Sequence, residues 1–230
     1  MLNSLSTKEA LKKSSLVIWL VNSYRDLLSR DYFCLHAKVE NRGYGKYRKM
    51  IRGNNNKIVI GENTRLTTPM FRIIGNNNTI LIGDNCFVGK NCSFWMEGNN
   101  IQIIIGNNTT FTQHNHLNAQ EEGSIIRVGN NCMFSNHIIV RTSDAHPIFD
   151  METGKRINPA RNVDIGNDVW IAPDSKIMKG AEIGDGCIIG SNSMVSNSIP
   201  AHSLAVGTPA KAVKTNVRWT RDDVLFHKFE

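Results

Sequence analysis

One six-residue rule repeats without interruption from Val163 to Val195, and it constrains the fold more than any other feature. Each unit opens on an aliphatic residue, usually followed by Gly or Ala, and has a small residue at its fifth position. An α-helix does not repeat at six residues, and a flat strand alternates at two. The period therefore predicts a chain that bends after every short strand. The aliphatic side chains that would point at the common axis are Ile165, Ile171, Ile177, Ile183, Ile189 and Val195.

The same phase continues upstream with coil starts 22 or 23 residues apart rather than 18. The surplus residues fall in polar turns such as Gly53-Asn54-Asn55-Asn56, whose residue types tolerate left-handed backbone. A repeat of roughly 20 residues is typical of a solenoid in one domain. The first positions expected to face its core are Ile60, Leu66, Ile82, Val88, Phe94, Ile105, Phe111, Val128, Phe134 and Val140.

The composition favours a single soluble domain in a reducing compartment, and we expect a cytoplasmic protein. The chain has 230 residues, and its longest apolar run, at Leu16–Val21, is far shorter than the roughly 20 residues of a membrane span. The cysteines are odd in number, and four of the five occupy the small fifth position of a hexapeptide. Core filling is therefore favoured over a disulfide framework or a metal site for these four, which are Cys86, Cys92, Cys132 and Cys187.

The positive charge is confined to the region ahead of the solenoid. Residues 1–52 contain eleven Lys or Arg and four acidic residues, while the remainder is neutral. A helix is expected around Thr7–Ser29, after a start that resembles a capping box. This basic region is interpreted either as a solvated helical cap on the first coil or as a landing patch for polyanions or the inner face of a membrane. Nucleic acid is disfavoured because no recognised motif accompanies the patch.

The repeat is broken once, between Arg141 and Asp164, and we expect chemistry at this break. A first position is due at residue 146, yet the phase resumes only at Ile165. A loop on a rigid scaffold is a favoured place for functional residues. The loop contains His146, although a lone loop histidine is more often structural or solvated than catalytic. The predicted domains are thus a cap at 1–52, a β-helix at 53–210 with an extruded loop at 141–164, and a tail or helix at 211–230, which Thr220 would cap.

Three segments together resemble the hexapeptide acyltransferases, which move acetyl from acetyl-CoA to sugar hydroxyls. They are His146-Pro147, the run Gly166–Ile171, and the tail Ala205–Lys214. The galactoside, maltose and capsule O-acetyltransferases show the same order. The segments Cys132–Ser135 and Ile138–His146 are similar to the polysialic-acid and related capsule O-acetyltransferases. The resemblance implies a left-handed parallel β-helix and a homotrimer with active sites between subunits.

The resemblance also implies roles for individual residues. His146 would be the general base in a direct transfer, because a neutral imidazole can take a hydroxyl proton near neutral pH. Asp144 or a backbone carbonyl would orient the imidazole. Trp170, the last residue of its hexapeptide, should point outward and line the acyl-donor end of the site. The other positions expected along coenzyme A are Ala172, Pro173, Ser191, Ser196, Asn197, Lys211 and Lys214.

Two of the implied coenzyme positions depart from the family pattern. Pro173 has no N–H, so it cannot supply an amide donor to the thioester oxygen. Asn197 stands where relatives often have a basic residue. The two lysines would act on the coenzyme phosphates as point charges.

Two histidines lie at equivalent positions of adjacent coils. His114 and His137 are each nine residues past a coil start, so they should stack on one face, and with Arg141 they are expected on the acceptor side. The rival interpretation is a three-histidine zinc centre that includes His146. We favour the acceptor wall and no metal.

Three functional classes follow from these residues. The first is an acetyl-CoA-dependent O-acetyltransferase acting on a sugar hydroxyl of a capsular or lipopolysaccharide glycan, with sialic acid polymers as the anionic candidate. The second is an N-acetyltransferase of amino sugars, nucleotide sugars or a small antibiotic. The third is a non-enzymatic solenoid, which leaves His146, Trp170 and the tail unexplained together. The localised basic charge favours a large anionic acceptor.

Overall fold

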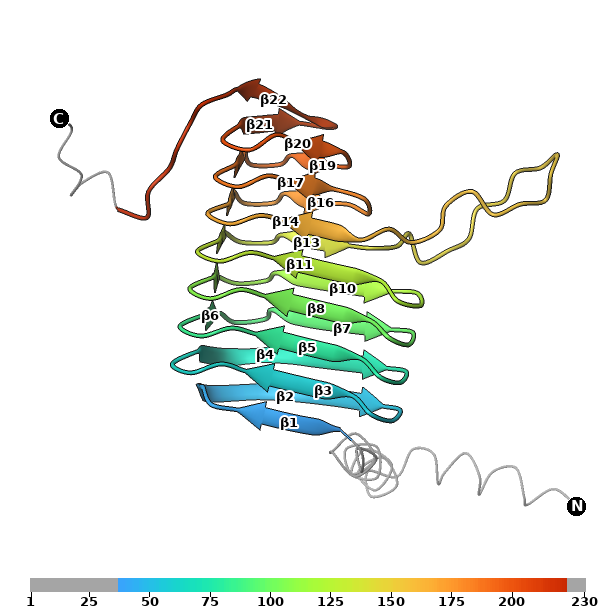
Figure 1. The fold of residues 1–230 in the computed structure, drawn as a ribbon, viewed down its shortest axis with the longest axis vertical. Coiled ribbons are helices and arrows are strands. Elements are labelled where there is room, and N and C mark those ends of the chain that lie inside the picture. Colours follow the sequence, from blue (N-terminus) through green and yellow to red (C-terminus); the bar gives the residue numbers. More distant parts are fainter. Residues whose placement is uncertain (1–36, 223–230) are drawn as a thin grey trace, which may run out of the picture.

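The computed structural model describes residues 37–222, which form a parallel β-solenoid with three flat faces (Figure 1). The described residues form strands and turns and contain no helix. None of them therefore lies in a helix that could cross a membrane. The all-β solenoid predicted from the hexapeptide period is confirmed. The helix expected around Thr7–Ser29 lies outside the described residues.

Face A is one sheet of eight parallel strands, each paired with its equivalent in the next coil. Its first strands pair in exact register, so that Lys38 lies opposite Lys57 and Ile60 opposite Ile82. The strands of face A, in stacking order, are β1 (Lys38–Asn41), β3 (Lys57–Ile60), β5 (Thr79–Ile82), β8 (Gln102–Ile105), β11 (Ile125–Val128), β14 (Val163–Ile165), β17 (Glu182–Ile183) and β20 (Ser198–Ile199).

Faces B and C are joined at the base of the solenoid, because β2 (Tyr44–Arg52) and β4 (Arg65–Ile74) run round the corner between them. Above the first parts of these strands, face B consists of β6 (Phe87–Val88), β9 (Thr110–Phe111), β12 (Met133–Phe134), β15 (Trp170–Ile171), β18 (Ile188–Ile189) and β21 (Leu204–Gly207). Above their second parts, face C consists of β7 (Ser93–Glu97), β10 (His116–Gln120), β13 (Ile139–Arg141), β16 (Lys176–Ile177) and β19 (Met194–Val195).

The core runs along the axis of the solenoid and is built from the predicted hexapeptide positions. Every first position named above is buried, and so are the small fifth positions, including the four predicted cysteine fillers. Phe71, Phe94, Phe111 and Phe134 form a column in which neighbouring ring centroids lie 5.3, 5.9 and 4.5 Å apart. Apolar burial along this column stabilises the stack, since each coil can bury its inner face only against its neighbours.

The corners contain the residues that bend the chain. Asn55, Asn77 and Asn100, in the three long polar turns, have φ values of 55°, 58° and 58°. This left-handed conformation is one that asparagine adopts more readily than most residues. The prediction that these turns take up the surplus residues is therefore confirmed.

The ends of the solenoid differ from the predicted domain limits. Residues 38–52 were assigned to a helical cap, but β1 and β2 pair with β3 and β4 and form the first coil. At the other end Ala210–Lys214 form β22, which pairs antiparallel with β21. The described residues 215–222 contain no helical turn, and the rest of the predicted C-terminal helix lies outside the described residues.

Candidate active site

The break in the repeat forms an arm, residues 142–162, which projects sideways from the corner between faces C and A (Figure 1). Its two limbs are joined by a bridge between Phe149 and Arg156. The arm exposes large apolar side chains to solvent, of which Met151 is 97% exposed. The others are Ile148, Phe149 and Ile157.

A cluster of polar side chains fixes the root of the arm. The Lys179 ammonium donates to Asp144 Oδ2 at 2.6 Å and to the carbonyl oxygen of Asn158 at 3.1 Å. The Asn158 side-chain amide donates to Asp144 Oδ2 and to the backbone carbonyl of His146, both at 2.9 Å. Hydrogen bonds from Lys179 and Asn158 hold the pKa of the Asp144 carboxyl below its usual range.

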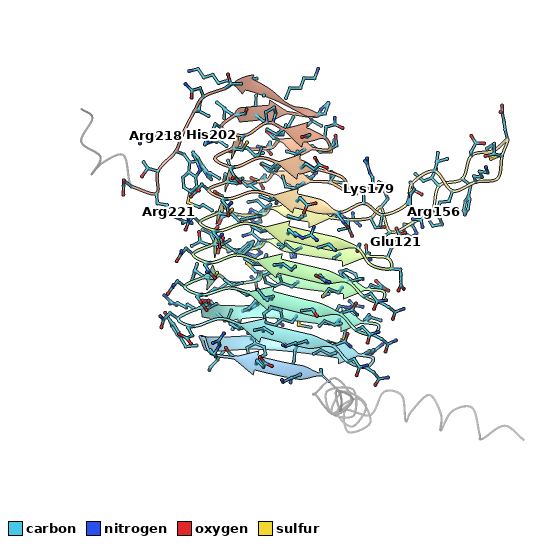
Figure 2. All side chains as sticks on the ribbon, viewed as in Figure 1. Glu121, Arg156, Lys179, His202, Arg218 and Arg221 are labelled. Carbon is cyan, nitrogen blue, oxygen red and sulfur yellow. The ribbon has the colours of Figure 1, made fainter. Side chains whose placement is uncertain are left out.

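A second ion pair ties the arm to the coil beneath it. The Arg156 guanidinium donates two hydrogen bonds of 2.7 Å to the two carboxylate oxygens of Glu121 (Figure 2). The Ser143 hydroxyl also donates to Glu121. These hydrogen bonds, above all those from Arg156, lower the pKa of Glu121 to about 2. Paired parallel hydrogen bonds of this kind restrict orientation as well as position.

His146 lies beside this root with an exposed side chain. Its backbone carbonyl accepts a hydrogen bond from the side chain of Asn158, which is itself buried. The role predicted for Asp144 needs correction, because its carboxylate engages Lys179 and Asn158 instead of the imidazole. Since the imidazole makes no hydrogen bond within the described part of the chain, it is accessible to a substrate.

His114 and His137 lie at the corner between faces B and C, where both have positive φ. Their rings stack with centroids 5.0 Å apart, so the predicted stacking is confirmed, although at a corner and not on a flat face. His137 Nδ1 lies 3.5 Å from Asp174 Oδ1 in the next coil. Because His146 follows the far end of face C, the structure does not bring the three histidines to one point. Within residues 37–222 no cluster of three metal-ligating side chains was found.

Trp170 points outward from face B and contacts a C-terminal segment that sequence reasoning missed. The rings of Trp170 and Trp219 lie 6.1 Å apart, and Trp219 Nε1 donates to the Asp168 carbonyl. Arg221 donates to Thr110 Oγ1 and to three backbone carbonyls, with Cys132 O the nearest at 2.8 Å. The tail after β22 thus descends along the corner between faces A and B (Figures 1 and 2).

The predicted coenzyme residues fall at three places in the chain. Pro173 and Ser191 lie at the same corner as His137, because the Asn192 amide donates to the Pro173 carbonyl and Asp174 to Asn136. Ser196 and Asn197 lie at the arm corner, one coil above Met178 and Lys179. Lys211 and Lys214 are exposed on β22 at the end of the solenoid.

Ala172 has few free polar atoms to offer a coenzyme. It is 6% exposed, its amide donates to the Ile189 carbonyl, and its carbonyl accepts from the Ser175 hydroxyl. Arg141, predicted on the acceptor side, ends β13 on face C immediately before the arm. A shallow groove on face A, lined by Arg127, Asp164 and Glu182 among others, contains none of the predicted site residues.

Comparison with known proteins places this architecture in a family. The family model described as bacterial transferase hexapeptide (six repeats) matches residues 162–197. A solved structure of the polysialic acid O-acetyltransferase OatWY is 29% identical with a TM-score of 0.72, covering 83% of this chain and 90% of that one. The structure of the polySia-specific acetyltransferase NeuO is 32% identical with a TM-score of 0.66, covering 82% and 90%.

A further relative is also a polysialic acid O-acetyltransferase, and its match covers a shorter part of the chain. The polysialic acid O-acetyltransferase of Escherichia coli O1:K1 / APEC is 38% identical over 86 residues, which are 37% of this chain and 28% of that protein. The chain thus spans less than a third of this relative. Because the NeuO match is 32% identical and covers 90% of that chain, this chain belongs to the hexapeptide-repeat family of acetyltransferases.

Proposed function

We propose that this protein is an acetyl-CoA-dependent O-acetyltransferase that acts on a sugar hydroxyl of an anionic glycan. The observation that carries the proposal is the similarity to two polysialic-acid acetyltransferase structures, which cover 83% and 82% of this chain. It is supported by the arm, which holds an accessible histidine at a place fixed by buried and ionic contacts. A non-enzymatic solenoid would require neither the accessible histidine nor the contacts that fix its position.

The chemistry assigned to His146 is general base catalysis. Its neutral imidazole takes the proton of the sugar hydroxyl as that oxygen attacks the thioester carbonyl. The tetrahedral intermediate then collapses, the carbon–sulfur bond breaks, and the imidazolium returns the proton to the departing thiolate. The hydrogen bond from the Asn158 side chain to the His146 carbonyl positions His146 for both proton transfers, and so does the Lys179–Asp144 ion pair. Transfer is direct, and no side chain becomes acetylated.

The complete site is proposed to form between copies of this chain. Within one subunit, His137 and the Pro173 corner lie at one edge of face C, whereas the arm begins at the other edge. The exposed apolar side chains of the arm, such as Phe149 and Met151, are suited to bury against a second copy. A homotrimer with three sites between subunits satisfies both requirements, and a fully active monomer would contradict it.

Thiol release from acetyl-CoA tests the function. The full chain is incubated with acetyl-CoA and a panel that contains oligomers of sialic acid, neutral oligosaccharides and amino sugars. We expect release with the sialic acid oligomers and little release with the neutral sugars. Mass spectrometry should find the new acetyl group on oxygen. Release with amines alone would replace this proposal with N-acetyl transfer, and release with no acceptor would refute acetyl transfer to sugars.

A further inference from the structure

Face C carries a row of four outward side chains that contain polar atoms. The proposed acetyl transfer assigns no step to any of them. Arg72 lies opposite Trp95, Trp95 opposite Asn118, and Asn118 opposite Arg141 in four successive coils. All four alternate with buried neighbours, so they point outward. With coils stacked about 4.8 Å apart, the row is about 14 Å long.

Each member of this row has a buried polar atom that lacks a hydrogen-bond partner. The atoms are Arg72 Nε, Trp95 Nε1, Asn118 Oδ1 and Arg141 Nε. Only one other such atom, Asn115 Nδ2, was found among the described residues. Unsatisfied buried polar groups are few in native proteins, because each forfeits the hydrogen bonds that it makes in water. Four in one row therefore distinguish this part of face C from the rest of the described surface.

The composition of the row matches an acidic oligosaccharide. The Arg72 guanidinium carbon lies 4.4 Å from the centre of the Trp95 ring, which keeps the cation flat against the aromatic surface. Neither Arg72 nor Arg141 forms an ion pair with a described residue, although the Arg141 charge helps to lower the pKa of Asp144. Arginine is the side chain best shaped to bind a carboxylate through two parallel hydrogen bonds.

Further basic side chains lie on face C, among apolar ones such as Met70. Arg48, Arg52 and Lys176 occupy outward positions beside the row, whereas Glu97 is the one acidic side chain at the outward positions of the described face C strands. Charged residues are depleted from the cores of protein–protein interfaces, so the charged row is an unfavourable place for contact with a second copy. The apolar arm is the better candidate for that contact.

We propose that the row Arg72–Trp95–Asn118–Arg141 binds successive acidic sugar units of the acceptor and guides the chain toward the arm. The row ends at Arg141, five residues before His146 and at the root of the arm. This inference rests on the proposed function, since it names how that site holds a long anionic substrate. Arg72 and Trp95, at the far end, bind units that are not acetylated in that encounter.

The length of the acceptor separates this role from catalysis. In Arg72→Gln and Trp95→Ala we expect KM for a long oligosialic acid to rise roughly tenfold, because a hydrogen-bonded charge or a stacking surface is lost, with kcat unchanged. KM for a sialic acid disaccharide, which is too short to span the row, should not change. Arg65→Gln is the matched control, because Arg65 also lies over an aromatic ring, that of Phe87, but on face B. It should leave both KM values as in the wild type.

Calorimetric titration of the full chain with long oligosialic acid, without acetyl-CoA, measures binding independently of turnover. Weaker binding in Arg72→Gln but not in Arg65→Gln supports the row even if thiol release fails, in which case only the proposed function is lost. Equal binding and equal KM in Arg72→Gln and the wild type would overturn the row. A change of assembly mass on sedimentation of Arg72→Gln or Trp95→Ala, with oligosialic acid binding retained, would overturn it in favour of a subunit interface.

Discussion

The solenoid and the arm of residues 142–162 are stabilised by opposite kinds of interaction. In the solenoid, apolar side chains are buried along an axis and every coil repeats the last. The arm buries few apolar side chains, exposes several, and is attached through Glu121–Arg156 and Asp144–Lys179. The difference predicts that a change in one region should leave the other largely intact.

The largest expected effect on stability comes from the aromatic column. Phe111→Ala removes a ring that contacts Phe94 and Phe134, and we expect a loss of about 3–5 kcal/mol in the free energy of unfolding. Lys155→Ala on the arm changes an exposed side chain that the proposed contact with a second copy does not use, and its unfolding midpoint should stay at the wild-type value. Urea unfolding followed by circular dichroism measures both. Similar midpoints for the two variants would contradict the division between regions.

The next effect is on activity and not on stability. Asp144→Asn removes the negative charge that pairs with Lys179 at the root of the arm, so Asn158 and the His146 backbone that it holds are less firmly positioned. Small displacements of a catalytic group have large effects on rate, and we expect kcat to fall roughly 10- to 100-fold with little change in melting temperature. Asp164→Asn is the control, since it breaks the Arg127 pair on face A, away from the arm. An equal loss of activity in both variants would exclude a specific role for the root.

A smaller effect is expected at the C-terminal tail. Arg221→Gln removes hydrogen bonds to Thr110 and to three carbonyls, and we expect the docked tail to lose about 1–2 kcal/mol of attachment free energy. Separation of Trp219 from Trp170 should shift the tryptophan emission to longer wavelength. Arg218→Gln, which changes a neighbouring exposed arginine, should leave the emission unshifted. An unshifted spectrum in Arg221→Gln would show that Arg221 does not hold the tail.

The smallest effect is a pH dependence of the arm. The pKa of Glu121 is lowered from 4.5 to about 2, chiefly by its hydrogen bonds from Arg156. A lowered carboxyl pKa stabilises the docked arm above pH 4.5, and this contribution is lost as the pH falls through about 2. After allowance for solvent screening, we expect on the order of 1 kcal/mol. NMR titration of the Glu121 carboxyl carbon should show the low pKa in the wild type and an ordinary one in Arg156→Gln.

The sequence predicted the solenoid well because its information is periodic. Ile165 and Phe111 could be assigned to the core from position alone, and the Gly53–Asn56 turn could be recognised from residues that tolerate positive φ. The limits of the repeat were less clear. The strands of residues 38–52 lack the hexapeptide residues, so their place in the first coil was missed.

The site was predicted only in part because its contacts are not periodic. His146 could be found as an interruption, and Trp170 as an outward position. Lys179 lies 35 residues from Asp144, and no spacing indicates that the two meet across the arm corner. Arg221 reaches Cys132, 89 residues away, through a tail that follows no repeat. Contacts of this kind depend on where side chains point at corners, which a period does not specify.

The central claim is that the solenoid is a scaffold and that His146 performs the chemistry. The most direct test compares thiol release by His146→Ala and by His202→Ala, since both histidines are exposed but His202 lies at a solenoid corner remote from the arm. We predict that His146→Ala lowers kcat by roughly 10²-fold or more, with unchanged unfolding and unchanged acetyl-CoA binding, while His202→Ala keeps wild-type turnover. Full activity in a correctly folded His146→Ala would contradict the account.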